Sequence, residues 1–274
     1  MRGADWGAKV ASGSKVFKPS GTGPFPVALI LHGCGGKTPF LEDYARVAVE
    51  AGYAAVVVDS FAPRGMSTLD AKLFVCTGMT LHGLKRSGDI FAMLSWLESQ
   101  PWADPERVFL AGWSHGAWSI MDGYAIGANA ARAVGIVDAD PLKLRTRVKG
   151  VLLVYPYAAY PSLTSNRGWG IDLQGAAGPK VFSVIGGKDQ VVGWKYPRKA
   201  LDRLKRDSLS VDTVFHADAT HAFDDDRAND PRPSTARIFS CRPRPISPRP
   251  STPCEATEPR KRKPWESAGA RQAT

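Results

Sequence analysis

Hydrophobic residues along the chain gather in short continuous runs, and longer amphipathic segments separate these runs. Aliphatic runs of this length are typical of strands that helices cover on both faces. They fall at residues 27–31, 53–59, 107–112, 148–155 and 180–185, and residues 211–215 alternate as a last strand should. Helical patterns follow at about 38–51, 82–98, 117–131 and 197–206, and residues 60–80 form a long connection. Strands that alternate with helices predict an α/β fold with a mostly parallel sheet and helices on both faces.

Polar residues of catalytic types follow the carboxyl ends of the predicted strands. Ligands of open parallel sheets bind at this edge, so these side chains are expected to lie close together. The residues are His32 and Cys34 after the first strand, Asp59 and Arg64 after the second, Ser114 after the third, Asp189 after the fifth and His221 after the last.

The stretch Gly112-Trp113-Ser114-His115-Gly116 has the spacing of a nucleophile elbow, in which a sharp strand-to-helix turn lifts a serine hydroxyl out of a sheet. Side chains at the two glycine positions would collide with the neighbouring strand and helix. The helix that follows would direct its first N–H groups and its positive dipole end toward the serine. A glycine-rich turn with a surface serine has the same spacing, so the motif needs support from the rest of the chain.

A serine hydroxyl is a weak nucleophile and needs a neighbouring base. Histidine can take the proton near neutral pH, and a carboxylate on its other ring nitrogen fixes the tautomer. Ser114, Asp189 and His221 occur in the chain order of such a triad on a parallel sheet. His216 is the main alternative base, although the longer loop before His221 favours the latter.

Three other polar groups near the predicted site are read as structural. We interpret His32 and His115 as structural histidines that flank the site. Residues 224–226 are three adjacent aspartates, which are most often a solvated loop.

Five stretches between residues 15 and 226 belong together: GPFPVALILHGCGG, DSFAPRG, GWSHG, IGGKDQVV and THAFDD. With these stretches, residues 15–226 resemble the dienelactone hydrolase family within the α/β-hydrolase fold. The enzymes that give the family its name carry cysteine at the nucleophile position, which is Ser114 here, whereas esterase-like relatives use serine. The resemblance therefore implies hydrolysis of a small ester or lactone through an acyl-enzyme, with Ser114, Asp189 and His221 as the triad.

Ester cleavage passes through an oxyanion that requires two preorganised N–H donors. The expected donors are the backbone N–H of His115 and a backbone N–H from the loop after the first strand, that of Cys34. The resemblance suggests that Arg64 holds a substrate carboxylate, although a solvent-facing loop arginine fits equally well. Trp113 either walls an acyl pocket or packs in the core.

No cofactor or metal is expected. Gly36-Lys37-Thr38 resembles the end of a phosphate-binding loop, but that motif requires glycine where Leu31 stands. The four cysteines show no C-x-x-C pair and no zinc-ligand spacing. We therefore interpret them as free thiols in a reducing cytoplasm. The residues before Phe17 hold no apolar segment of signal-peptide length, and no apolar run is long enough to span a membrane.

The composition changes near residue 227, which divides the chain into an expected hydrolase domain, 1–226, and a tail, 227–274. The formal net charge is +10, and the tail holds 11 Lys/Arg against 4 Asp/Glu, so the basic pI is weak support for a nucleic-acid partner. Its Arg-Pro-rich composition predicts disorder, and no sequence suits the helix that normally follows the catalytic histidine. A gene whose reading frame is altered near residue 227 would encode a tail of the same unusual composition. Two alternatives follow: an inactive relative that lacks this helix, or a binder of acidic partners through the tail.

Overall fold

The computed structural model describes residues 1–225 except 77–78, 160, 164–177 and 208. These residues lie in the first of two compact units, Met1–Thr235; the second unit is Ala236–Thr274. The expectations about a disordered tail and a missing last helix fall on residues outside the described ones. Cys241 and Cys254 lie outside them as well.

A seven-stranded sheet forms the centre of the described unit, with the strand order β1-β3-β2-β4-β5-β6-β7. Every neighbouring pair is parallel except β1 and β3, which are antiparallel. The strands are β1 (Lys15–Phe17), β2 (Phe25–Leu31), β3 (Ala54–Val58), β4 (Ala103–Trp113), β5 (Val148–Val154), β6 (Lys180–Gly186) and β7 (Val211–His216). The predicted α/β fold with a mostly parallel sheet is confirmed.

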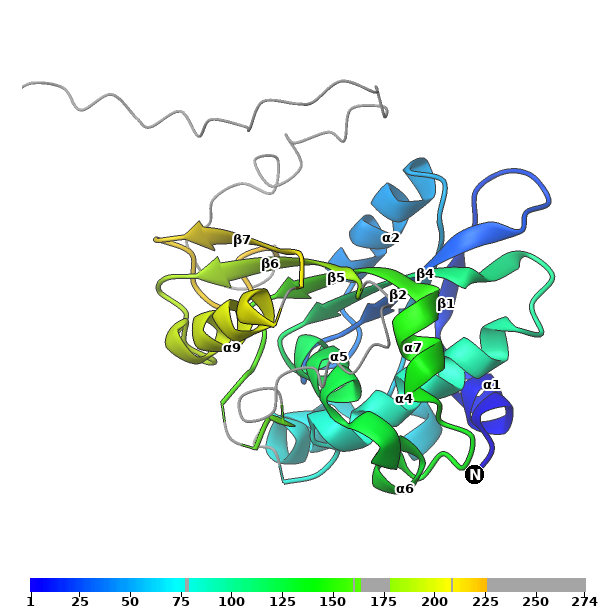
Figure 1. Ribbon diagram of the computed structural model, residues 1–274, viewed down its shortest axis with the longest axis horizontal. Coiled ribbons are helices and arrows are strands. Elements are labelled where there is room, and N and C mark those ends of the chain that lie inside the picture. Colours follow the sequence, from blue (N-terminus) through cyan, green and yellow to red (C-terminus); the bar gives the residue numbers. More distant parts are fainter. Residues whose placement is uncertain (77–78, 160, 164–177, 208, 226–274) are drawn as a thin grey trace, which may run out of the picture. The chain divides into compact units, whose positions relative to one another are not determined.

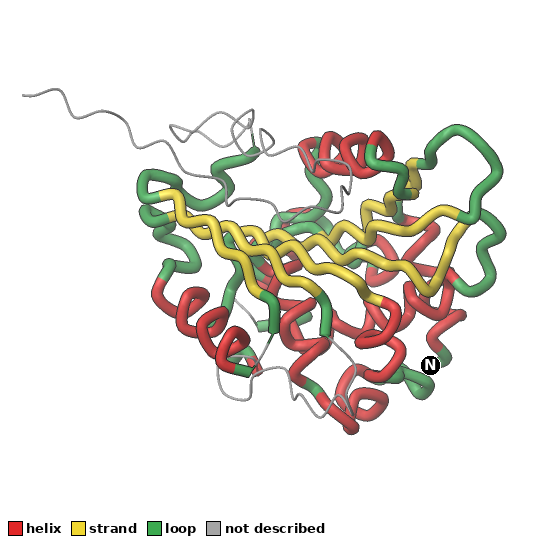
Figure 2. The backbone as a smooth tube through the Cα atoms, turned by 45° about the horizontal axis from the view of Figure 1, so that its top comes forward, coloured by secondary structure: helices red, strands yellow, loops and turns green. Residues whose placement is uncertain are grey.

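Helices lie on both faces of the twisted sheet (Figures 1 and 2). Helix α2 covers one face near β2 and β3, and α4, α5, α7 and α9 lie against the other. The helices are α1 (Gly3–Gly13), α2 (Phe40–Glu50), α3 (Thr68–Asp70), α4 (Gly83–Leu97), α5 (His115–Ala125), α6 (Ala130–Val134), α7 (Pro141–Arg147) and α9 (Lys195–Arg206). Shorter helical turns are Ala62–Arg64, Ala71–Val75 and Gly127–Asn129.

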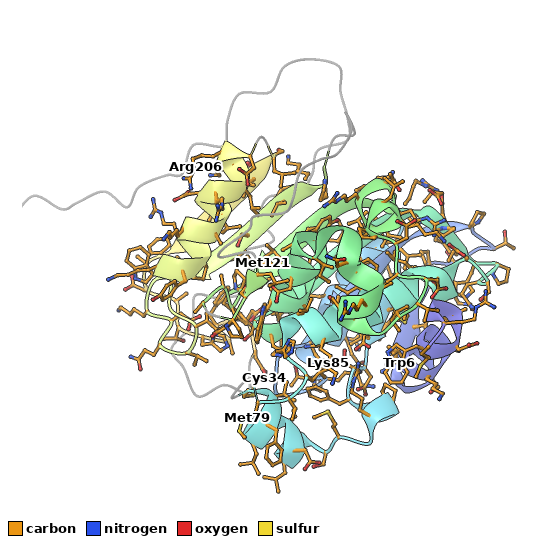
Figure 3. All side chains as sticks on the ribbon, turned by 60° about the horizontal axis from the view of Figure 1, so that its bottom comes forward. Trp6, Cys34, Met79, Lys85, Met121 and Arg206 are labelled. Atoms are coloured by element: carbon orange, nitrogen blue, oxygen red, sulfur yellow. A yellow bond between two sulfur atoms is a disulfide. The ribbon has the colours of Figure 1, made fainter. Side chains whose placement is uncertain are left out.

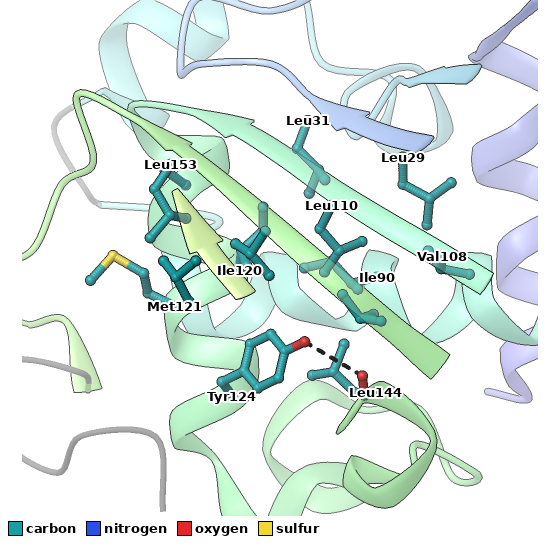
Figure 4. Close-up of a cluster of buried hydrophobic side chains, with 14 of the residues drawn as sticks. Leu29, Leu31, Ile90, Val108, Leu110, Ile120, Met121, Tyr124, Leu144 and Leu153 are labelled. Carbon is teal, nitrogen blue, oxygen red and sulfur yellow. Dashed lines mark hydrogen bonds between the residues drawn. The ribbon is translucent and has the colours of Figure 1, made fainter. Parts of the chain in front are cut away.

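The main core lies between the sheet and helices α4 and α5. In Figure 4, leucines of β2 and β4 face Ile90 of α4 and Ile120 of α5. Leu29, Leu110 and Ile120 are all at most 1% exposed. Burying one such side chain stabilises a fold by roughly 1.5–3 kcal/mol, which explains why the aliphatic runs of the sequence become the central strands.

The predicted strands are all confirmed, and the differences lie in the helices and at the edge of the sheet. The expected helix 117–131 is instead α5, a short turn and then α6. The turn begins at Gly127, whose φ is +67°. The connection 60–80 contains short helical turns, and residues 77–78 lie outside the described part. Helix α1 and strand β1 carry no long apolar run, and the sequence did not predict them.

The interpretation of Cys34 and Cys76 as free thiols is wrong. The two residues form a disulfide across a sequence separation of 42, with Cα atoms 5.0 Å apart (Figure 3). Tertiary folding brings residues 71–76 beside the loop after β2, which a search for closely spaced cysteines could not detect. The expectation of a reducing cytoplasm therefore loses its support from this pair. Among the described helices, none combines the length and the apolar character needed to cross a membrane.

Candidate active site

Ser114 occupies a strained turn between β4 and α5. Its backbone has φ 51°, and a non-glycine residue held in this region costs of order 1–3 kcal/mol. A Cβ atom at Gly112 would lie 2.6 Å from the backbone nitrogen of Ala117, and one at Gly116 would lie 2.3 Å from the carbonyl oxygen of Leu31. The predicted reason for both glycines is confirmed, because α5 and β2 approach the turn too closely for any side chain.

Backbone hydrogen bonds hold Ser114 in this turn. Its N–H donates to the carbonyl of Val154 at the end of β5 (2.9 Å), and its carbonyl accepts from Trp118 in α5 (3.0 Å). The loop after β2 adjoins the serine, since a Cβ on Gly33 would lie 3.7 Å from the Cβ of Ser114. The nucleophile candidate thus lies where β2, β4 and β5 end.

The structure brings Asp189 and His221 together as the sequence predicts. Oδ2 of Asp189 accepts from Nδ1 of His221 at 2.8 Å, and Oδ1 accepts from the backbone N–H groups of Val191 (2.9 Å) and Val192 (3.0 Å). Because a carboxylate only accepts, Nδ1 carries the hydrogen, and Nε2 is left as a base. The Asp189 side chain is 1% exposed and that of His221 is 19% exposed. The carboxylate is therefore buried, whereas the imidazole remains partly accessible from solvent.

Tyr155 lies next to both the histidine and the serine turn. Its ring centroid is 4.6 Å from that of His221, and it directly follows Val154, which binds the Ser114 N–H. Within the described residues, the Ser114 hydroxyl makes no hydrogen bond to His221. Such bonds are often long in free enzymes and shorten when substrate binds.

In two other histidines, the ring nitrogen that lacks a hydrogen already accepts a hydrogen bond, so neither is a candidate for the base. Nη1 of Arg86 can only donate, so Nδ1 of His115 accepts from it at 3.1 Å. Nδ1 of His32 donates to the carbonyl of Gly33, and Nε2 accepts from the N–H of Ser60. Burial, followed by the charge of Arg86, lowers the pKa of both imidazoles well below the usual range. Both are buried and neutral, in accord with the structural role predicted for them.

His216 lies at the end of β7 and packs edge-on against Phe223, with ring centroids 6.0 Å apart. Burial lowers its pKa. No carboxylate among the described residues pairs with it, whereas Asp189 pairs with His221. The geometry therefore favours His221 over His216 as the base.

Arg86 of α4 is a fully buried cation beside the serine turn. Its Nε donates to Oγ of Ser60 (2.9 Å), and its Nη1 donates to the carbonyl of His32 (2.8 Å) as well as to His115. Burial lowers the pKa of Arg86 to about 9, so the guanidinium remains charged at neutral pH. The position of this residue in the site could not be predicted from the sequence, because a lone arginine in a helical pattern is usually solvent-exposed.

Asp224 is buried, so the expectation of a solvated loop is wrong for this residue. Its Oδ2 accepts from Tyr44 (2.8 Å) and from Nε1 of Trp113 (2.6 Å), and its Oδ1 accepts from Tyr155 (2.8 Å). Burial raises the pKa of Asp224, and the three hydrogen bonds partly oppose that effect. The carboxylate therefore links Trp113, which precedes Ser114, to the loop that carries His221.

The two residues suggested for substrate binding make contacts of a structural kind. The Arg64 guanidinium forms two hydrogen bonds to Asp89 (2.9 and 3.0 Å), donates to the carbonyl of Ser60 and lies over the ring of Trp6. Trp113 is 1% exposed, as expected of a core residue. Arg64 is thus paired with a buried carboxylate, and Trp113 is buried in the core.

A pocket of about 560 Å³ opens beside Asp189 and the residue before His221. It is lined by residues 187–196 and by Thr220, so it includes Asp189 and the residue that precedes His221.

Among the described residues, no group of three or more His, Cys, Asp or Glu side chains is arranged to hold a metal ion.

Comparison with known proteins gives a family and a fold. Residues 13–240 match the family described as the dienelactone hydrolase family. No protein with a curated description matches the chain.

Among solved structures, the chain is similar to a dienelactone hydrolase candidate from Klebsiella pneumoniae subsp. pneumoniae MGH 78578 (TM-score 0.56, 16% identity, 78% of this chain and 84% of that one). It is similar to esterase 2 of Thermogutta terrifontis (TM-score 0.55, 14% identity, 79% and 82%). It is also similar to a promiscuous dienelactone hydrolase-like phosphotriesterase from metagenomic libraries (TM-score 0.53, 16% identity, 79% and 80%). At these identities the likeness shows the fold, that of the α/β hydrolases.

Proposed function

The chain belongs to the dienelactone hydrolase family, and on this premise we propose that it is a serine hydrolase that cleaves a small carboxylic ester or lactone. The observation that carries the proposal is the hydrogen bond between Asp189 and His221, at the sheet edge where the strained Ser114 turn also lies. A carboxylate held by two backbone N–H groups orients an imidazole whose second nitrogen is available as a base. That arrangement suits activation of a serine hydroxyl.

The proposed reaction has two halves. Oγ of Ser114 attacks the carbonyl carbon of the ester while Nε2 of His221 takes the hydroxyl proton. The bond to the leaving alcohol then breaks, and the imidazolium returns the proton to the departing oxygen, which leaves an acyl-enzyme. A water molecule then attacks the acyl carbon while Nε2 of His221 takes its proton. The bond to Oγ of Ser114 breaks, the imidazolium returns the proton to Oγ, and the acid is released. With a lactone, the alcohol and the acid leave as one hydroxy acid.

The tetrahedral intermediates carry a negative charge on the former carbonyl oxygen. We assign its stabilisation to the backbone N–H groups of His115 and Cys34. His115 is the first residue of α5, where N–H groups have no partner within the helix and the dipole is positive. Cys34 follows Gly33, which adjoins Ser114. Loss of one such donor typically costs about 2.7–4 kcal/mol in the transition state.

Covalent labelling tests this proposal directly. One of the similar structures is described as esterase 2 of Thermogutta terrifontis phosphorylated by paraoxon. We expect paraoxon to phosphorylate this chain once, at Ser114, as located by peptide mass spectrometry. Ser114→Ala should show no labelling and should hydrolyse short-chain 4-nitrophenyl esters and small lactones at least about 10³-fold more slowly. Its melting temperature should match that of the wild type, because little packing is lost.

Two outcomes would defeat the proposal. Labelling at a residue other than Ser114 would mean that the nucleophile is wrongly assigned. A folded wild type that neither reacts with paraoxon nor turns over any member of an ester and lactone panel would instead indicate an inactive relative.

A further inference from the structure

Arg86 contacts both segments that would stabilise the oxyanion. Its Nη1 donates to the carbonyl of His32, at the start of the loop that carries Cys34, and to Nδ1 of His115. Helix α5 and this loop meet closely here, because a Cβ on Gly116 would lie 2.7 Å from the same His32 carbonyl. One planar cation thus lies at the junction of the two segments.

We propose that Arg86 is a positioning residue that sets the spacing and orientation of the two oxyanion donors, His115 N–H and Cys34 N–H. The inference rests on the function proposed above. Arg86 does not touch substrate; it acts through the backbone of His32 and the side chain of His115.

The cost of burying Arg86 supports a role beyond stability. The side chain is fully buried, and its hydrogen bonds go to a hydroxyl, a carbonyl and an imidazole rather than to a carboxylate. The nearby carboxylate of Asp89 is bound by Arg64 instead. A buried cation without a carboxylate in contact is unfavourable, because no full opposite charge beside it offsets its loss of hydration. A residue retained at that cost is expected to serve a geometric or electrostatic purpose.

The chemistry of arginine suits this position better than that of any other residue. The guanidinium presents several N–H donors in one rigid plane, so it can hold Ser60, His32 and His115 in fixed relative positions. Lysine would keep the charge but lose the plane. The ring of Phe61 lies 5.8 Å from the guanidinium carbon, which further limits its movement.

The test compares Arg86→Lys and Arg86→Met with Lys85→Met, a control at the neighbouring, exposed position of the same helix. Each protein is titrated with paraoxon so that rates are expressed per reactive serine. The kcat and KM are measured for an ester and for its thiono analogue, in which sulfur replaces the carbonyl oxygen. The inhibition constant of a trifluoromethyl ketone, which mimics the oxyanion, and the melting temperature are also measured.

We expect kcat on the ester to fall by about 10²-fold in both Arg86 variants, with KM within about threefold, since displaced donors weaken the transition state alone. The thiono ester should lose less, because sulfur is a weak hydrogen-bond acceptor and gains less from the donors. The inhibition constant of the ketone should rise in parallel with the loss of kcat/KM. Lys85→Met should match the wild type.

A purely structural role would give a different result. It would lower the melting temperature and the fraction of protein that paraoxon titrates. The kcat per reactive serine would then either stay within about threefold of the wild type or fall equally for the ester and the thiono ester. Either result would overturn the inference. If both Arg86 variants fail to fold, Ser60→Ala removes one hydrogen bond from the guanidinium, and the same comparison of ester with thiono ester decides. A wild type without activity would defeat the proposed function itself.

Discussion

Replacement of Asp224 tests whether one buried carboxylate holds the two halves of the site together. Asp224→Leu keeps the branching at Cγ but removes every acceptor. Two buried donors then lose their partner, the hydroxyl of Tyr155 and Nε1 of Trp113, and the half-buried hydroxyl of Tyr44 loses its hydrogen bond to this carboxylate. An unsatisfied buried donor costs roughly 1–3 kcal/mol, so the two buried donors predict a loss of about 2–6 kcal/mol. That is a large part of the stability of a typical domain.

Asp224→Asn is the matched control. Its carbonyl oxygen can accept from Trp113 and Tyr44 in place of Oδ2, and its NH₂ group can donate to Tyr155 if that hydroxyl reverses. All three partners keep a hydrogen bond to residue 224, so we expect the stability of the Asn variant to lie within about 1 kcal/mol of the wild type in mild acid.

The pH dependence separates the two variants further. Burial raises the pKa of Asp224 in the folded state above its unfolded value, which is about 3.9 for aspartate. Between these two pKa values the folded state binds more protons, so the wild type loses stability as pH rises through that window. The Asn variant lacks this titration. Its stability relative to the wild type should therefore increase from mild acid to neutral pH.

Urea unfolding at several pH values, followed by tryptophan fluorescence and by far-ultraviolet circular dichroism, measures these differences. Ester turnover is measured in parallel, because Tyr155 packs against the His221 ring. We expect kcat/KM to fall by more than about tenfold in the Leu variant and to stay within about threefold in the Asn variant. A Leu variant as stable as the wild type, or an Asn variant with an unchanged pH slope, would refute the reasoning.

Three further predictions concern the disulfide, the turn and the base. Cys76→Ser should lower the free energy of unfolding in urea by about 4 kcal/mol, which is the loop-closure value for a sequence separation of 42. A reductant should lower the stability of the wild type by the same amount and leave that of the variant unchanged. Gly116→Ala should abolish ester turnover and lower the melting temperature, because its methyl group would collide with backbone oxygens. The control Gly35→Ala should keep the wild-type melting temperature, because no atom lies within 4 Å of a Cβ at that position. Equal melting temperatures of the two variants would contradict this reasoning. His221→Ala should lose at least about 10³-fold in kcat and His216→Ala should stay near the wild-type rate; the reverse result would move the base to His216.

Local patterns in the sequence were sufficient for most of the fold and for the order of the site. A buried strand in a parallel sheet has a continuous aliphatic sequence wherever it occurs in the chain. The strands β2 to β6 could therefore be located without tertiary information. The elbow glycines could be identified because the turn constrains residues that are adjacent in the chain. Asp189 and His221 could be proposed as partners because the carboxyl ends of parallel strands meet at one edge. Their hydrogen bond confirms that they come together.

Contacts between distant segments depended on the tertiary structure. The Cys34–Cys76 disulfide, the Arg86 junction and the Asp224 cluster join residues that no local spacing relates. A charged side chain has the same letter whether it is solvated or buried, and most such residues are solvated, so burial of Arg86 and Asp224 could not be expected. The same holds for α1 and β1, which are ordered by packing against α4 and by pairing with β3 rather than by their own hydrophobicity. The sequence therefore specified which groups carry out the proposed chemistry, and packing between segments decided which groups hold them in place.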